Sequence, residues 1–216
     1  MPVRKIPKNY RNVTGIISRN KAIGKAMFES TLERDFLNLL EFESYVASFE
    51  VQPVSIGWLD EAQHMHKYTP DVLVYFKNPQ RKLMLCEIKY RSELKEKWSI
   101  LKPKFKAAVC YARDRNWRFK IMTEKEIRGQ KLENIKFLLP YIRRGPHAEG
   151  DMDILDSALT TVRQSTPAQL LELIYQDEWN RARLLPTLWY LLGTHQVGFD
   201  IHQKLTMQTP IWTIRP

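Results

Sequence analysis

Two neighbouring apolar runs stand out in this chain, YTPDVLVYF at residues 68–76 and LMLCEIK at residues 83–89. Both are rich in the branched and aromatic residues that favour strands, and the second is apolar on both faces, which is typical of a central strand. Between them lies Asn78-Pro79-Gln80-Arg81, a composition typical of a turn. The two runs therefore predict a β-hairpin inside a sheet.

The segments around this hairpin predict further helices and strands. Apolar residues recur at helical spacing over residues 28–42, which predicts an amphipathic helix. Residues 46–58 look extended, and Pro53 places this strand at an edge or at a bulge. A helix over residues 95–113 and a strand over residues 118–122 follow. This order predicts a mixed α/β core.

Two acidic side chains and a lysine meet in the predicted hairpin. Asp71 opens the first strand and Glu87 lies in the second, so the hairpin brings both carboxylates to one end of the sheet. Glu87 and Lys89 are two residues apart in a strand, so they project from the same face. Paired carboxylates repel unless a cation joins them, and oxygen ligands suit Mg²⁺ or Mn²⁺. With a lysine to act on water and phosphate, the pattern favours metal-assisted phosphodiester hydrolysis.

The same residues also have a purely structural interpretation. Asp after Pro is a common turn device, and Glu-x-Lys on a strand is often a solvated ion pair. Here, however, both acids adjoin apolar strands, and the preceding helix carries Glu29 and Glu33 on or beside its apolar stripe. Burial of an unpaired carboxylate costs free energy, so acids on a core-facing side need a partner. The combination favours a nuclease site.

This pattern resembles the PD-(D/E)xK nucleases and, more closely, the TnsA endonuclease subunits of heteromeric transposases. The resemblance covers roughly residues 25–125. It is carried by four stretches, which are FESTLERDF at 28–36, QP at 52–53, YTPD at 68–71 and CEIK at 86–89. It implies an α/β fold with a restriction-endonuclease-like mixed-sheet core.

The resemblance also implies roles for the central residues. Asp71 and Glu87 are the implied metal ligands, together with the backbone carbonyl of Ile88, and Lys89 is the residue that acts on the nucleophilic water. The implied cofactor is Mg²⁺, with Mn²⁺ as the other candidate. The resemblance therefore predicts that the chain is a Mg²⁺-dependent endodeoxyribonuclease.

Two further positions belong to the implied site. An acid of the first helix completes the catalytic set, and we assign this role to Glu33, with Glu29 one turn earlier as the alternative. Glu33 is also a candidate metal ligand. Gln52, on the intervening strand, either contacts metal-bound water or DNA or is a simple edge-strand polar residue.

The implied biology is cut-and-paste DNA transposition. Proteins of the TnsA type nick the 5′ strand at each transposon end, while a separate DDE transposase of the TnsB type cuts and joins the 3′ ends. The implied substrate is therefore double-stranded DNA at transposon ends. The residues alone reach only a metal-dependent DNA nuclease; the transposon comes from the resemblance.

The basic charge lies in the first two thirds of the chain. The formal net charge is +10 at pH 7; residues 1–149 hold 29 Lys and Arg against 17 Asp and Glu, whereas residues 150–216 hold 5 against 7. We expect phosphate contacts from an N-terminal basic arm and from the helix after the Glu-x-Lys strand. The candidates are Arg4, Lys5, Lys8, Arg11, Lys21, Lys25, Lys95, Lys97, Lys102, Lys104 and Lys106. Solvated side chains without a specific role are the alternative.

The last third looks like a separate domain. The turn-rich stretch RRGPHAEG at residues 143–150 predicts a boundary. We therefore expect a basic arm at residues 1–27, a nuclease domain at residues 28–145 and a C-terminal domain at residues 150–216.

The C-terminal domain is expected to be small, α+β and winged-helix-like. Helices are predicted over residues 153–163, 167–175 and 179–192, and a two-stranded wing over residues 196–202 and 209–214. Its net charge of −2 favours a protein partner over DNA. The resemblance points to an AAA+ regulator ATPase of the TnsC type and to the DDE transposase.

Other classes fit the sequence poorly. No apolar run is long enough to span a bilayer, and no secretory signal is visible, so no membrane role is expected. Cys86 and Cys110 cannot form a disulfide framework, which favours a reducing compartment, here the bacterial cytosol on DNA. His64 and His66 lack the further ligands of a zinc site, so we expect them in a loop near DNA.

Two alternatives remain open at this stage. One is a stand-alone restriction or repair endonuclease on the same core. The other is a DNA-bound adaptor of transpososome assembly whose nuclease core is vestigial; the intact acid, acid and lysine set argues against it.

Overall fold

The structure is a computed structural model, and its description covers residues 15–17, 20–60, 63–146, 148–214. The chain divides into two compact units between Ile127 and Arg128. Among the described residues, no helix has the length and apolar character needed to cross a membrane.

A four-stranded mixed sheet forms the centre of the first unit. It contains β3 (Val46–Val51), β6 (Val72–Phe76), β7 (Met84–Ile88) and β8 (Arg118–Met122) in that spatial order. The β6–β7 pair is antiparallel, with Val72 opposite Cys86, whereas β7 and β8 are parallel. The predicted central hairpin is therefore confirmed, and the mixed α/β fold class with it.

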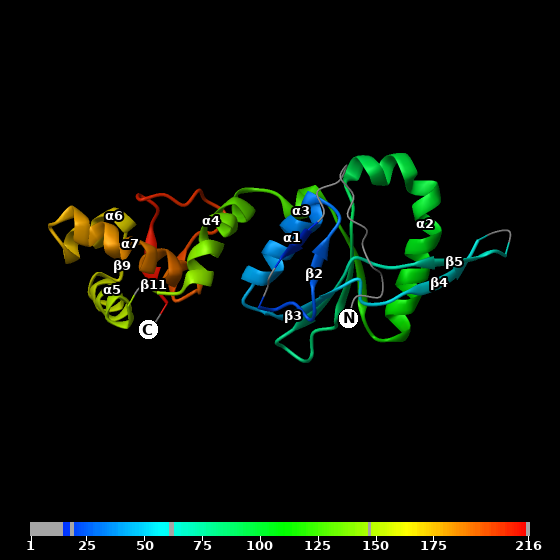
Figure 1. Ribbon diagram of the computed structural model, residues 1–216, viewed down its shortest axis with the longest axis horizontal. Coiled ribbons are helices and arrows are strands. Elements are labelled where there is room, and N and C mark those ends of the chain that lie inside the picture. The colour runs from blue at the N-terminus through cyan, green and yellow to red at the C-terminus, as the bar shows by residue number, and fades with distance from the viewer. Residues whose placement is uncertain (1–14, 18–19, 61–62, 147, 215–216) are drawn as a thin grey trace. The chain divides into compact units, whose positions relative to one another are not determined.

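Two helices cover this sheet from opposite sides, α1 (Thr31–Phe42) and α2 (Arg91–Asp114) (Figure 1). The expected helix start at Phe28 is wrong, because Ser30 caps the first turn and Phe28 instead ends β2 (Ala26–Phe28), which pairs with β1 (Gly15–Ile17). The second helix begins four residues before the expected Lys95, with non-helical backbone at Lys97.

The extended stretch over residues 46–58 is not one strand. After β3, Gln52 has a φ of +51°, and the chain then forms β4 (Ile56–Leu59), which pairs with β5 (Met65–Tyr68) in a separate two-stranded sheet. This β4–β5 hairpin runs against α2 and projects beyond it (Figure 1).

The two histidines belong to this hairpin, so the loop expected for both is only partly right. His66 lies in β5 and His64 precedes it. His66 Nε2 lies 2.8 Å from Asp60 Oδ2, and its ring stacks on Trp58.

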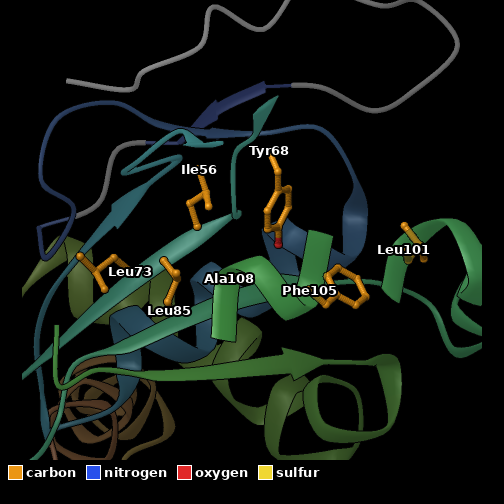
Figure 2. Close-up of a cluster of buried hydrophobic side chains, with 7 residues drawn as sticks. All are labelled: Ile56, Tyr68, Leu73, Leu85, Leu101, Phe105 and Ala108. Atoms are coloured by element: carbon orange, nitrogen blue, oxygen red, sulfur yellow. The ribbon is translucent and has the colours of Figure 1, made fainter. Parts of the chain in front are cut away.

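Apolar side chains from the sheet, α2 and the β4–β5 hairpin share one buried cluster (Figure 2). Its members are Ile56, Tyr68, Leu73, Leu85, Leu101, Phe105 and Ala108. Because side chains alternate along a strand, Asp71 and Glu87 project from the same sheet face as Leu73 and Leu85. The core thus fixes α2 beside both acids.

The first unit ends with α3 (Glu124–Ile127), and the second begins with α4 (Gln130–Arg144). It continues through α5 (Glu149–Val162), β9 (Gln164–Ser165), α6 (Pro167–Ile174), α7 (Glu178–Gly193), β10 (Val197–Phe199) and β11 (Ile211–Thr213). The three strands form one antiparallel sheet with β11 in the middle. The two expected C-terminal strands therefore do pair with each other, and β9 is a third strand that was not expected from the sequence.

The unit boundary lies before α4, not at residues 145–150 as expected. The side chain of Asn134 in α4 donates to the carbonyl oxygens of Ile201 and Gln203 at 2.9 Å and 2.7 Å. Ile142 packs against Gly193 so closely that a Cβ there would lie 2.6 Å from its Cγ1. Because α4 packs within the second unit, the turn-rich stretch at residues 143–150 connects two helices of the same unit, α4 and α5.

Candidate nuclease site

Asp71 and Glu87 face each other across the β6–β7 pair. The antiparallel register places them opposite one another just beyond the last paired residues, and the Asp71 backbone N–H donates to the Cys86 carbonyl at 3.1 Å. The Ile88 backbone N–H donates to Asp71 Oδ2 at 2.6 Å. The hairpin therefore brings together the two carboxylates that the sequence singled out.

Lys89 joins both carboxylates. Its Nζ lies 3.3 Å from Glu87 Oε1, 4.0 Å from Asp71 Oδ2 and 3.1 Å from the Ile88 carbonyl oxygen. Its backbone N–H donates to the Met122 carbonyl, which ties this end of β7 to β8. The lysine therefore projects from the same face as both acids.

Glu87 is 1% exposed, and two residues that the sequence analysis did not place in the site hold it. The Tyr68 hydroxyl donates to Glu87 Oε2 at 2.6 Å, and Lys104 Nζ donates to Oε1 at 3.4 Å. The sequence predicts no role for Tyr68, which lies in the YTPD stretch, and it places Lys104 among the lysines expected to contact DNA. The other candidate lysines of α2 are exposed, namely Lys95, Lys97, Lys102 and Lys106.

The charges of the site shift one another's protonation. Burial, and then repulsion from Glu87, raise the pKa of Asp71 well above its ordinary value. Burial alone lowers the pKa of Lys89, but the attraction of Asp71 and Glu87 outweighs it, so the net shift is upward and the ammonium form is favoured. The hydroxyl of Tyr68 also has a raised pKa, because of burial and the negative charge of Glu87. Tyr68 therefore stays a hydrogen-bond donor.

Glu33 forms a capping box at the start of α1. The Glu33 backbone N–H donates to Ser30 Oγ at 3.1 Å, and its carboxylate accepts from the Glu29 backbone N–H at 2.8 Å and from Ser30 Oγ at 2.9 Å. Burial raises the pKa of Glu33, which also interacts electrostatically with Lys89 and with Asp71. Glu33 thus lies near the hairpin acids while it caps the helix.

Glu29 and Gln52 meet beside the same strands. Because α1 begins at Thr31, Glu29 lies before the helix and not within it, one turn ahead of Glu33, as expected. The Gln52 side-chain amide donates to Glu29 Oε1 at 3.3 Å, and its backbone N–H donates to the Asp71 carbonyl at 2.8 Å.

Gln52 combines strain with an unsatisfied oxygen. Its φ of +51° lies in the left-handed region, which is costly for a residue with a side chain, and such strain gathers at functional sites. Its side chain is buried, and Oε1 finds no hydrogen-bond donor in the described part of the chain. Buried polar atoms are normally paired, so this oxygen favours a bound water or ion nearby.

The donor set fits a divalent cation that prefers oxygen. It consists of the Asp71 and Glu87 carboxylates, which already share an ammonium group, and the Ile88 carbonyl beside it. Within the described ranges, no three His, Cys, Asp or Glu side chains converge as a metal-binding group. Mg²⁺ needs no such cage, because it binds through one or two carboxylates and keeps several waters.

The N-terminal candidates divide into two sets. Arg4, Lys5, Lys8 and Arg11 lie outside the described residues. Lys21 Nζ donates to the carbonyl of Glu43 at the end of α1 at 2.7 Å, so this side chain is not free to contact phosphate. Lys25 is exposed.

Comparisons with known families agree with this architecture. Residues 43–124 match the family described as TnsA-like endonuclease N terminal, and residues 126–201 match TnsA endonuclease C terminal. The junction between them adjoins the boundary before Arg128. No curated protein matches the chain. Since the two matches are consecutive and together run from residue 43 to residue 201, the chain belongs to the TnsA endonuclease family.

Proposed function

We propose that this protein is the metal-dependent DNA endonuclease subunit of a heteromeric transposase, which cleaves the 5′ strands of transposon ends in cut-and-paste transposition. The observation that carries the proposal is the ammonium of Lys89, which joins the carboxylates of Asp71 and Glu87 at the end of one hairpin. The TnsA-like N-terminal match includes all three residues.

Asp71, Glu87 and the Ile88 carbonyl hold the cofactor in this proposal, with Mg²⁺ the favoured ion. A divalent cation at such a site supplies charge stabilisation to the attacked phosphate and lowers the pKa of bound water. Lys89 orients the attacking water and compensates the charge that develops on the phosphate. Glu33 completes the negative site from α1, outside the region that the N-terminal family match covers.

DNA contacts are proposed for the exposed lysines of α2. Lys95, Lys97, Lys102 and Lys106 are exposed on the helix that also carries Lys104 next to Glu87. Multiple phosphate contacts hold a duplex without selecting its sequence. The choice of transposon ends is therefore assigned to the DDE transposase.

The second unit is proposed as a winged-helix-like protein-binding domain. Its elements run helix, strand, helix, helix, strand and strand from α5 to β11, an order that suits a winged helix. The slight acidic excess of residues 150–216 favours a protein partner over DNA. The resemblance to TnsA proteins suggests an AAA+ regulator of the TnsC type and the TnsB-type transposase as those partners, on DNA in the cytosol.

Strand-specific cleavage at labelled transposon ends tests this function. The chain is mixed with a TnsB-type DDE transposase, a TnsC-type AAA+ ATPase and Mg²⁺, and nicks are mapped on each strand. We expect 5′-strand nicks that depend on all three proteins and vanish with Asp71→Asn. Efficient cleavage of plain duplex by the chain alone supports a stand-alone nuclease, and cleavage unchanged by Asp71→Asn supports an adaptor.

A further inference from the structure

Two ammonium groups crowd one oxygen of Glu87. Oε1 lies 3.3 Å from Lys89 Nζ and 3.4 Å from Lys104 Nζ, while Oε2 accepts the hydroxyl of Tyr68 at 2.6 Å. The side chain of Glu87 is otherwise shielded from solvent. Both of its oxygens are therefore engaged by this chain's own donors.

The crowded oxygen is also the one that shares the Lys89 ammonium with Asp71. Lys89 contacts Oε1 with the same Nζ that reaches Asp71 Oδ2 at 4.0 Å, whereas Oε2 is taken by Tyr68. A cation shared by the two carboxylates therefore needs Oε1. Lys104 Nζ already contacts that oxygen at 3.4 Å.

Lys104 is held in this position by more than one contact. Its side chain is 21% exposed, and its Nζ lies 4.6 Å from the ring centroid of Tyr68 and 5.3 Å from that of Phe105. Cation–π contacts of this kind stabilise an ammonium over an aromatic face. Its neighbours Lys102 and Lys106 are exposed, so Lys104 alone of the three is directed inward.

We propose that Lys104 is a positioning residue that competes with the divalent cation for Oε1 of Glu87, and so sets the metal concentration at which the nuclease site fills. The inference rests on the proposed function. The Lys104 ammonium and a divalent cation bound at the same oxygen are both positive, and they repel each other strongly in a partly buried site. The ammonium at Oε1 therefore opposes binding of the cation. Lys89 and Tyr68 still hold Glu87 when Lys104 leaves it.

Calorimetric titration of the full chain with Mn²⁺, without DNA, tests this inference. Lys104→Met keeps an apolar stem against Tyr68 and Phe105 but removes the charge, and we expect Mn²⁺ to bind on the order of tenfold more tightly. Lys104→Arg keeps the charge and should stay within about twofold of the wild type. Lys82→Met is the matched control, because Lys82 is an exposed lysine ahead of β7. Its Mn²⁺ affinity should also stay within about twofold of the wild type.

Two results overturn the inference. Unchanged or weaker Mn²⁺ binding by Lys104→Met shows that Lys104 is no competitor, provided that near-UV circular dichroism reports a native fold. Equal Mn²⁺ affinities of Lys104→Met and Lys82→Met also show that Lys104 does not compete with the cation. A wild-type protein that binds no Mn²⁺, or an Asp71→Asn variant that binds it equally well, instead removes the proposed metal centre itself.

A second readout separates competition from a merely structural role. In strand-cleavage assays, the Mg²⁺ concentration that gives half-maximal rate should fall for Lys104→Met, in the same direction as the Mn²⁺ affinity. A structural role alone lowers the maximal rate and leaves this concentration unchanged, which contradicts the proposal.

Discussion

Asp71 has a carboxylate that burial and the nearby charge of Glu87 favour in its protonated form. A raised pKa in the folded state means that the native protein binds the proton more tightly than the unfolded chain does. The associated stability is fully present below the unfolded pKa and is lost as pH rises through the folded pKa. At neutral pH, the metal-free site therefore lowers the stability of the fold.

Asp71→Asn is expected to stabilise the metal-free protein while it abolishes metal binding. The amide oxygen can still accept the Ile88 N–H, but the repulsion from Glu87 is gone. We expect Tm to rise by about 2–5 °C at pH 8 and by less at pH 5. Thermal unfolding with and without Mn²⁺ measures both effects. Asp153→Asn, at an exposed position of α5, is the control, and a lower Tm for Asp71→Asn at pH 8 contradicts the argument.

Lys89→Met is expected to stop cleavage and to destabilise the metal-free protein. Without the ammonium, the carboxylates of Asp71 and Glu87 face each other with less compensation. We expect the cleavage rate at saturating Mg²⁺ to fall on the order of 10³-fold, as when one transition-state donor is removed. Single-turnover cleavage at labelled ends measures the rate. A loss of less than tenfold excludes Lys89 from the chemistry.

At the level of elements, the start of α1 combines a structural and a chemical task in one side chain. Glu33 closes the capping box with Ser30, and its carboxylate also interacts electrostatically with Lys89 and Asp71. Helix capping explains why an acid stands here even without catalysis. Substitutions can separate the two tasks.

Glu33→Gln preserves the capping box, because Gln also serves at this position, but removes the charge. We expect a stability change below about 0.5 kcal/mol, within the range of a retained cap, and a drop in cleavage of more than tenfold. Ser30→Ala, which loses the cap, should instead cost about 1 kcal/mol. Urea unfolding and cleavage rates measure the two effects. A larger cleavage defect in Glu29→Gln makes Glu29 the acid of the site.

The exposed lysines of α2 are expected to contribute salt-dependent DNA affinity. In Lys102→Met/Lys106→Met, two proposed phosphate contacts are lost, so the slope of log K against log salt should shrink by about 2. Affinity should fall equally for transposon-end and unrelated duplexes. Fluorescence anisotropy at several salt concentrations measures this. An unchanged slope places the DNA on another face.

At the scale of the whole molecule, the two units bury separate cores. Gly198 in β10 leaves no room for a side chain, because an added Cβ would overlap the indole of Trp212 in β11. Gly198→Ala should therefore destabilise the second unit by about 1–3 kcal/mol through overpacking.

The first unit is expected to be unaffected by this change. We expect hydrogen exchange of Gly198→Ala to rise in β10 and β11 but not in β6 and β7, and Mn²⁺ still to stabilise the first unit. A matching loss of protection in β6 and β7 contradicts the independence of the two cores.

Sequence reasoning succeeded where the information is local. Val72–Phe76 and Met84–Ile88 form the expected hairpin, because apolar runs on either side of a turn have few alternatives. It failed at Gln52, where a residue in the left-handed region divides the expected strand in two. Pro53 correctly indicated an edge strand or an irregularity here, but the left-handed conformation of Gln52 is unusual for Gln and could not be predicted.

What the sequence by itself determined is the hairpin and the shared face of Glu87 and Lys89, since strand alternation depends only on spacing. Only the tertiary structure decided that Tyr68 and Lys104 hold Glu87 and that α4 belongs to the second unit. Those contacts join residues that are distant in the chain. Their geometry follows from how α2 and the β4–β5 hairpin pack on the sheet, and no local pattern encodes that packing.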